Sequence, residues 1–381
     1  MQTSGQAKRF VCKQNMCNGC MACLHVCEKD AITICDDPKA YNAVIDEGKC
    51  VNCRRCERVC PRQTMVESHR PILWVQGWAK DNAVRRAGSS GGYATAIMRA
   101  FITKLKGSVV SCVYQDGAFG FAVANTADEC FRFCGSKYVK SNPALAYEPI
   151  QTLLREDKKV LFLGLPCQVA GVKNAIPAAF EDNFYSVDLI CHGTPSPQLL
   201  DRYLQEDHRK SIKDMPVIAF RNKTNYRLSQ GEAGALMPAG VQDRYTMAFL
   251  NSLDYTENCY NCDYAKVERV SDITLGDSWA SGMPESDIRQ GISLALCQTE
   301  KGKQLLELAD IEMRPVDVDA AIAANRQLRT PSIAPRQSKR FWESLEKGRS
   351  FGSAVFAAYP KICLKQDIKA LLVKTGLRKK T

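Results

Sequence analysis

Short apolar runs, each bounded by turn-forming residues, recur along the chain from residue 72 onward. Runs of this length predict buried β-strands. We expect strands over 72–78, 109–114, 160–165, 184–190, 217–220, 273–276 and 292–297. Apolar residues at helical spacing instead predict helices over 93–102, 197–209 and 299–309. Because strands and helices alternate, the pattern predicts a mixed α/β body.

Near the C-terminus, a predicted helix has one apolar face and lysines at its other positions. The apolar face is formed by Leu364, Ile368, Leu371 and Leu372, and the lysines are Lys365, Lys369 and Lys374. A basic amphipathic helix of this kind can lie on a membrane surface or dock a partner. Packing against the helix's own domain is commoner, and we expect that arrangement here.

Two copies of one cysteine spacing occupy the start of the chain. They are Cys17-x2-Cys20-x2-Cys23-x3-Cys27 and Cys50-x2-Cys53-x2-Cys56-x3-Cys60. The double run resembles the ligands of a bacterial-type ferredoxin with two 4Fe-4S clusters, in which the fourth cysteine of each run binds the other cluster. The resemblance implies one ligand set of Cys17, Cys20, Cys23 and Cys60, and a second set of Cys50, Cys53, Cys56 and Cys27.

Two other uses of these cysteines fit the pattern less well. Paired Cys-x2-Cys motifs can build a zinc site, but such a site uses four ligands, and eight cysteines stand here in two identical runs. A disulfide framework is disfavoured because the chain opens without an apolar signal segment, and closely spaced cysteines rarely pair in a reducing cytosol. We therefore expect a cytoplasmic iron-sulfur protein.

Length and charge narrow the class of protein further. A chain of 381 residues is long enough for two or three compact units. No apolar run is long enough to span a bilayer, so any membrane contact would be peripheral. The net charge is +11, but the basic residues are scattered and no nucleic-acid-binding motif is found, so we expect no nucleic acid partner. A basic surface would also steer an acidic redox partner.

A glycine-rich loop at 88–92, with the sequence GSSGG, runs directly into the predicted helix at Tyr93. Such a loop exposes backbone N–H groups, and the N-terminus of the helix adds a favourable potential for a phosphate. A plain flexible loop before a helix explains the glycines equally well. The loop matches neither the GxGxxG pattern nor the P-loop pattern.

Four further cysteines stand in distinctive surroundings. Cys167 and Cys191 each follow a predicted strand, which would put both at the sheet edge where α/β folds build their sites. The Cys259-x2-Cys262 loop, folded over that edge, would complete four thiolates for a third 4Fe-4S cluster. The spacing alone leaves ordinary buried cysteines as an equal alternative. His192, beside Cys191, is a candidate proton donor, or it only bonds to the cluster or orients its loop.

Six segments carry a wider resemblance, and they occur in order along the chain. They are GSSGG (88–92), GSKYV (135–139), LPCQVAG (165–171), DLICHG (188–193), CYNC (259–262) and SDITLGDSW (271–279). Together they resemble the coenzyme F420 hydrogenase/dehydrogenase beta subunit family over residues 71–345. Several members of that family carry a two-cluster ferredoxin domain ahead of a flavin domain. The resemblance implies a bound FAD with an iron-sulfur cluster beside it, which favours the third cluster.

The resemblance also gives the glycine loop and a second loop near residue 137 roles in holding the FAD. The implied cofactor contacts are Ser90, Gly91, Gly92, Thr95, Ser136, Lys137, Tyr138 and Asp277. An aspartate such as Asp277 can equally cap a turn or a helix. The segment 220–226 matches only in part the arginine-containing motif of the family, at which a substrate contact would lie.

These patterns predict an α+β or mixed α/β protein with three segments. They are a two-cluster ferredoxin domain over 1–70, an FAD and iron-sulfur domain over 71–345, and a basic helical tail over 346–381. A flavin accepts a hydride as two electrons and can release them singly to iron-sulfur clusters. We therefore expect an oxidoreductase that acts on an unknown organic substrate. Its donor would be either ferredoxin or the reduced deazaflavin coenzyme F420. The alternative is a non-catalytic subunit that carries electrons between a soluble donor and a separate enzyme.

Overall fold

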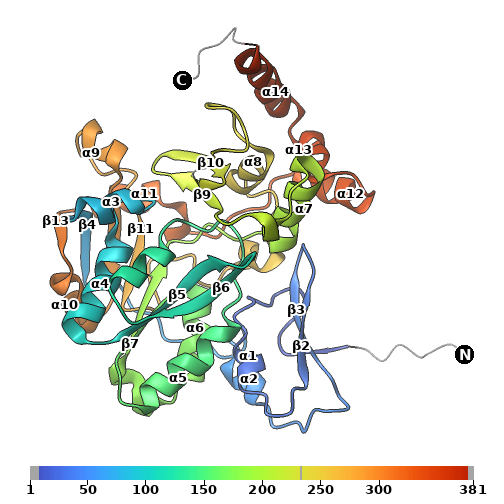
Figure 1. The fold of residues 1–381 in the computed structure, drawn as a ribbon. Coiled ribbons are helices and arrows are strands. Elements are labelled where there is room, and N and C mark those ends of the chain that lie inside the picture. The colour runs from blue at the N-terminus through green and yellow to red at the C-terminus, as the bar shows by residue number, and fades with distance from the viewer. Residues whose placement is uncertain (1–7, 232–233, 376–381) are drawn as a thin grey trace, which may run out of the picture.

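The computed structural model describes residues 8–231 and 234–375, which form a small N-terminal unit packed beside a larger α/β body (Figure 1). The body is built on one eight-stranded sheet with the strand order β13-β4-β12-β11-β8-β7-β5-β6. Its strands are β4 (Leu73–Ala79), β5 (Ser108–Gln115), β6 (Ala118–Ala124), β7 (Val160–Leu163), β8 (Phe184–Leu189), β11 (Ile273–Asp277), β12 (Ser293–Cys297) and β13 (Ile311–Arg314). The mixed α/β class predicted from the sequence is confirmed.

The middle of the sheet is parallel and its two sides are antiparallel. Strands β5, β7, β8 and β11 run in one direction, and the remaining strands pair antiparallel. All four residues of β7 are buried, as expected for a strand covered on both faces. The run predicted at 217–220 falls instead on β9 (Ala219–Asn222), which pairs with β10 (Asn225–Ser229) in a separate two-stranded sheet.

Helices cover both faces of the sheet (Figure 1). One core contains α4 (Tyr93–Leu105) and α10 (Glu300–Leu308), and α3 (Asn82–Ala87) precedes the glycine loop. The opposite core contains α5 (Tyr147–Arg155) and α6 (Pro166–Ala175). The second of these cores is shared with the N-terminal unit, so one continuous apolar interior joins the two parts of the chain.

The N-terminal unit has an internal duplication. Its elements are β1 (Arg9–Phe10), α1 (Ala22–His25), β2 (Ile32–Asp36), β3 (Tyr41–Ile45) and α2 (Arg55–Val59), with the three strands in the order β1-β3-β2. Each short helix follows a left-handed residue, Met21 (φ 63°) in one half and Arg54 (φ 59°) in the other. The equal cysteine spacing therefore produces the same local backbone twice, as a ferredoxin-like duplication requires.

The C-terminal half adds α7 (Pro197–His208), α8 (Arg244–Leu250), α9 (Glu285–Gln290), α11 (Val318–Ala324), α12 (Ser338–Glu346), α13 (Phe351–Ala358) and α14 (Pro360–Lys374). Phe351 and Val355 are buried in one core with Leu200 of α7, so this core continues past the boundary we placed at residue 345. Within the described ranges, every helix is too short or too polar to cross a lipid bilayer.

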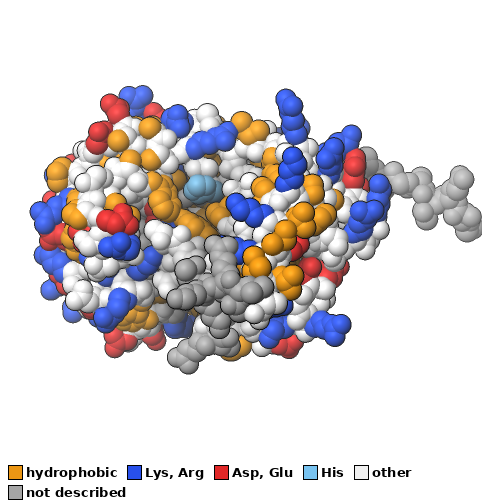
Figure 2. Space-filling view, turned by 90° about the horizontal axis from the view of Figure 1, so that it is seen from above, with side chains coloured by type: hydrophobic (Ala, Val, Ile, Leu, Met, Phe, Trp, Pro, Cys, Tyr) orange, Lys and Arg blue, Asp and Glu red, His pale blue; other side chains and the backbone are white. Residues whose placement is uncertain are grey.

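The apolar face predicted near the C-terminus does not pack on the domain as we expected. In α14, Leu364, Ile368 and Leu371 are 54%, 52% and 61% exposed, and the helix is held instead by Cys363, Ala370 and Val373. Figure 2, seen from the end of the molecule where α14 lies, shows apolar and basic side chains next to each other on the surface. The expectation was wrong because periodicity defines a face without defining what covers it.

Candidate functional site

A cavity of about 370 Å³ opens at the carboxyl edge of the parallel strands. Its walls include Gly164 just after β7, Cys191 just after β8, and Asp277 at the end of β11. The space-filling view of this end of the molecule shows a hollow that contains a histidine side chain (Figure 2). Open α/β sheets bind ligands at this edge, and the volume lies within the range of cofactor pockets.

The glycine loop forms one wall of the cavity. Ser89, Ser90 and Gly92 line it, and Gly92 caps α4 with a φ of 90°. In the part of the chain that the structure describes, no acceptor pairs with the backbone N–H groups of these three residues. Free N–H groups at the start of a helix are what an anionic phosphate requires.

Gly91 has a different position from the one we expected. It does not line the cavity, and a Cβ there would lie 2.4 Å from the carbonyl oxygen of Gly77 and 2.7 Å from the nitrogen of Ser293. The missing side chain therefore lets the loop pack against β4 and β12. Ser90 lines the cavity, but its hydroxyl donates to the carbonyl of Ile292 at 2.7 Å. The backbone of Ser90 is the part available to a ligand.

Lys223 fixes the shape of this loop, and sequence reasoning missed it. Its ammonium donates to the carbonyl oxygens of Arg85, Gly88 and Ser90, the last two at 2.7 and 2.8 Å. Because a trans peptide points its N–H away from its carbonyl, these bonds turn the neighbouring N–H groups away from Lys223. Burial, with the charges of Arg85 and Arg221, lowers the pKa of Lys223 to about 8.

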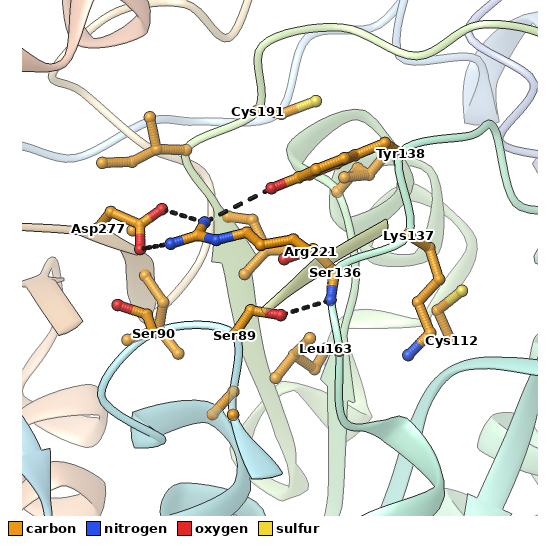
Figure 3. Close-up of a pocket in the computed structure, with 18 of the residues that line it drawn as sticks. Ser89, Ser90, Cys112, Ser136, Lys137, Tyr138, Leu163, Cys191, Arg221 and Asp277 are labelled. Atoms are coloured by element: carbon orange, nitrogen blue, oxygen red, sulfur yellow. Dashed lines mark hydrogen bonds and ion pairs between the residues drawn. The ribbon is translucent and has the colours of Figure 1, made fainter. Parts of the chain in front are cut away.

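The second predicted loop lies beside the glycine loop. The backbone nitrogen of Ser136 donates to the hydroxyl of Ser89 at 2.7 Å, which ties the two loops together (Figure 3). Tyr138 lines the cavity and stacks on Phe249 with ring centroids 4.3 Å apart. Thr95, one turn into α4, also lines the cavity and lies 3.2 Å from the sulfur of Cys134.

Lys137 lines the cavity, but its ammonium is bound by its own loop. It donates to the carbonyl oxygens of Phe133 and Cys134 at 2.7 and 3.1 Å, and Figure 3 shows its side chain beside Cys112. Burial lowers the pKa of Lys137. The side chain therefore braces the loop in this structure, and a phosphate contact would require it to exchange these carbonyls for the ligand.

Arg221 and Asp277 form a bidentate ion pair in the cavity, at 2.6 and 2.7 Å (Figure 3). The guanidinium lies over the rings of Tyr226 and Trp279, 4.9 and 5.4 Å from their centroids. Burial alone would lower the pKa of Arg221, but the hydrogen bonds and charge of Asp277 outweigh it and raise the pKa. The partial match of segment 220–226 to the family motif was the only sequence signal for this arginine.

The four cysteines of the second constellation lie together. Cys167 is near the start of α6, Cys191 follows β8, and Cys259 and Cys262 flank the end of a short 3-10 helix, Glu257–Asn261. Burial raises the pKa of Cys191, and the charges of the other three cysteines raise it further. Burial raises the pKa of Cys167 to about 12; the charge of Lys140 opposes this rise, and the charges of Cys262 and Cys259 add to it. Four crowded, partly buried thiols fit a site in which iron holds them as thiolates.

The N-terminal cysteines group as the ferredoxin resemblance implies. The pKa of Cys20 is raised by burial and then by the charges of Cys23, Cys17 and Cys60, which are the members of the first ligand set. The second set, Cys27, Cys50, Cys53 and Cys56, lines a hollow of about 160 Å³. The fourth cysteine of each run therefore lies with the other run.

The described cysteines form no site for a single metal ion. Among the residues that the structure describes, no group of three or more His, Cys, Asp or Glu side chains could hold one metal ion. A zinc site gathers four ligands about 2.3 Å from one centre, whereas a cluster spreads its thiolates around a cube. The assignment to clusters rests on the cysteine spacing in the sequence and on the thiols that share one environment.

His192 lies on the cavity wall next to Cys191. Its backbone carbonyl accepts from the hydroxyl of Ser332 at 2.5 Å, which fixes the loop after β8. Loss of hydration lowers the pKa of His192, so the ring is neutral near pH 7. All the predicted catalytic and cofactor-contact residues except Gly91 line the cavity. Of the predicted cluster ligands, Cys191 alone lines it.

Comparisons with known proteins agree with this geometry. Residues 74–147 match the family described as coenzyme F420 hydrogenase/dehydrogenase, beta subunit N-term, and residues 157–319 match the corresponding C terminus. Residues 16–64 match a 4Fe-4S dicluster domain. No curated protein matches the sequence.

Among solved structures, the chain is similar to a subunit in a xenon-derivatised F420-reducing NiFe hydrogenase complex from Methanosarcina barkeri. The TM-score is 0.50 and the identity 20%, with 68% of this chain and 88% of that chain covered. At this identity the likeness concerns the fold.

The dicluster match and the grouped cysteines define an iron-sulfur protein with a redox role. Within that class, the chain belongs to the coenzyme F420 hydrogenase/dehydrogenase beta subunit family, with a 4Fe-4S dicluster domain in its N-terminal part. The resemblance found in the six sequence segments is confirmed.

Proposed function

We propose that this protein is a flavin- and iron-sulfur-dependent oxidoreductase, with reduced coenzyme F420 or ferredoxin as its donor and an organic molecule as its substrate. The observation that carries the proposal is the position of Cys191, which lines the cavity and also belongs to a set of four cysteines. A ligand in the cavity would lie next to that set. We also propose a cytoplasmic location, where thiols are kept reduced.

The residues present fit an FAD. The free N–H groups of the glycine loop suit the phosphates, and Ser136 and Tyr138 would contact the cofactor from the second loop. When bound, FAD would supply two-electron hydride chemistry, and three 4Fe-4S clusters would supply one-electron carriers. The cluster ligands would be the two N-terminal sets together with Cys167, Cys191, Cys259 and Cys262.

The other cavity residues would orient the reacting molecule. The ion pair of Arg221 and Asp277 presents a fixed charged edge, and the rings of Tyr226 and Trp279 present aromatic surface beside it. A flat donor such as a deazaflavin suits that combination. His192, neutral at the cavity wall, would donate or accept a hydrogen bond at the same molecule, and protons released on oxidation would return to solvent.

The composition of the protein tests this proposal. Anaerobically purified protein should contain stoichiometric FAD and about twelve iron atoms with equal sulfide per chain. About eight iron atoms would remove the third cluster and leave the ferredoxin domain. Zinc without sulfide, or the absence of flavin, would overturn the proposal.

A second candidate is a non-catalytic subunit that carries electrons between a donor and a separate enzyme. The exposed apolar side chains of α14 favour it, since such a surface fits a partner protein, and the solved relative is part of a complex. Bleaching of the bound flavin by reduced F420 in the isolated chain would favour the enzyme. Reduction that requires a second protein would favour the subunit.

A further inference from the structure

The ferredoxin unit contacts the body through the loops that carry cysteine ligands. Asn18, which follows Cys17, accepts a hydrogen bond at its side-chain oxygen from the amide of Asn258 at 3.3 Å. Asn258 directly precedes Cys259. The loop of the first N-terminal set is therefore bonded to the loop that supplies two cysteines of the third set.

Arg62 makes a second connection between the same loops. It lies two residues after Cys60, donates to the carbonyl oxygen of Asn261 at 3.0 Å, and forms an ion pair with Asp263. Its side chain is only 13% exposed. Asn261 and Asp263 flank Cys262, so this arginine joins the loop after one ligand directly to both neighbours of another.

Helix α6 makes the closest contact. Cys167 lies in its first turn, and Gly171 lies one turn later against Cys20 of the N-terminal unit. A Cβ on Gly171 would lie 2.8 Å from the Cβ of Cys20, 2.9 Å from its sulfur and 3.1 Å from the hydroxyl of Tyr147. No side chain fits in that space without displacement. The absence of one at Gly171 lets a ligand of each set lie within one turn of the same helix.

Tyr147 holds this contact from the other side. Its hydroxyl donates to the carbonyl oxygen of Cys20 at 2.6 Å, and its ring stacks on His25 at a centroid distance of 5.1 Å. The side chain of Tyr147 is buried, so the bond is shielded from water. The Cys20 loop is thus fixed both in position and in orientation on the body.

The second N-terminal set has different surroundings. Cys53 is exposed, as are Asn52, Arg54 and Arg55 around it. The hollow that this set lines is formed by residues of the N-terminal unit alone. The two ferredoxin sets are therefore not equivalent: one faces the body and the other faces solvent.

We propose that α6 and the Cys259–Cys262 loop form a rigid joint that fixes the separation between the Cys17 set and the Cys167 set. Gly171 is the positioning residue of this joint, and Arg62 is its brace. The Cys17 set is the inner one, and the Cys27 set is the outer one at which a partner exchanges electrons. The inference rests on the third cluster of the proposed function.

The test is electron paramagnetic resonance of the full-length protein reduced with dithionite, with iron and sulfide measured on the same samples. Two reduced clusters held at a short, fixed distance give a spin–spin splitting, and that splitting depends on their separation and not on turnover. Gly171→Ala should reduce or abolish the splitting while the iron content stays at about twelve per chain. Gly120→Ala is the matched control, because a Cβ there meets only the Asn142 carbonyl oxygen at 4.0 Å.

Arg62→Gln is the second variant, since it weakens the joint without crowding a ligand. If Gly171→Ala loses iron, the test rests on Arg62→Gln. We expect that variant to keep its full iron content and to show a reduced or broadened splitting. Unchanged splitting in every variant that retains full iron would overturn the joint. About eight iron atoms in the unsubstituted protein would instead remove the third cluster, and the inference would fail together with that part of the proposed function.

Discussion

Lys223 should control how tightly the cavity binds FAD, although it does not line the cavity. Lys223→Met removes the ammonium that bonds to three carbonyl oxygens, those of Gly88 and Ser90 in the glycine loop and that of Arg85 in the preceding helix α3. Each hydrogen bond to a charged donor contributes about 1.5 kcal/mol or more, but the half-buried carbonyls would regain some water. We expect a net loss of about 2 kcal/mol, or FAD binding about 30-fold weaker.

The assay is a fluorescence titration of FAD into flavin-free protein, at pH values from about 7 to 10. Because the pKa of Lys223 is lowered to about 8, the side chain loses its charge as the pH rises through that value. FAD affinity of the unsubstituted protein should therefore fall above pH 8, and Lys223→Met should remove that dependence. Lys104→Met, at the exposed far end of α4, is the control. Equal affinities for the two variants would refute the role of Lys223.

Three further outcomes are expected. Cys191→Ser should remove about four iron atoms per chain, whereas Cys297→Ser, at the end of β12 and buried in the core beneath α4 and α10, should remove none; equal iron in both would contradict the third ligand set. Asp277→Asn should lower the urea unfolding free energy by about 2 kcal/mol because Arg221 loses its counter-charge, and adding Arg221→Gln should restore part of it. Burial raises the pKa of Asp254 to about 8. The folded protein therefore keeps a proton that the unfolded chain releases above about pH 4, and stability falls as the pH rises from about 4 to about 8. Asp254→Asn should therefore raise Tm at pH 8 but not at pH 4, and an equal rise at both would contradict this assignment.

Much of the fold followed from local pattern. The strands β4, β5, β7, β8, β11 and β12 lie in a sheet with helices on both faces. Such strands need nearly continuous apolar residues, so an apolar run in the sequence predicts them. β13 was missed because Glu312, Met313 and Arg314 leave it only partly buried, and an edge strand needs less apolar surface. β6 was missed because Gly120 interrupts its apolar residues.

The two N-terminal cysteine sets could be predicted from spacing because their ligands are concentrated in two short segments, whereas the set of Cys167, Cys191, Cys259 and Cys262 was favoured only by the family resemblance. The ion pair of Arg221 and Asp277 could not be predicted, and neither could the hydrogen bond from Lys223 to the carbonyl of Gly88. The two residues of each pair are far apart in the sequence and meet only in the folded chain. Gly91 was assigned to the cavity because a glycine cluster does not indicate which member faces a ligand. The prediction that the apolar face of α14 packs on its own domain was wrong for a similar reason, because helical periodicity carries no information about the neighbouring surface.

The most direct test is the visible absorption spectrum of the anaerobic protein during addition of reduced coenzyme F420. We expect flavin absorption that bleaches on addition, followed by bleaching of the iron-sulfur absorption as electrons reach the N-terminal cysteine sets. A protein that carries no flavin, or whose flavin is bleached by neither reduced F420 nor reduced ferredoxin, would contradict this expectation.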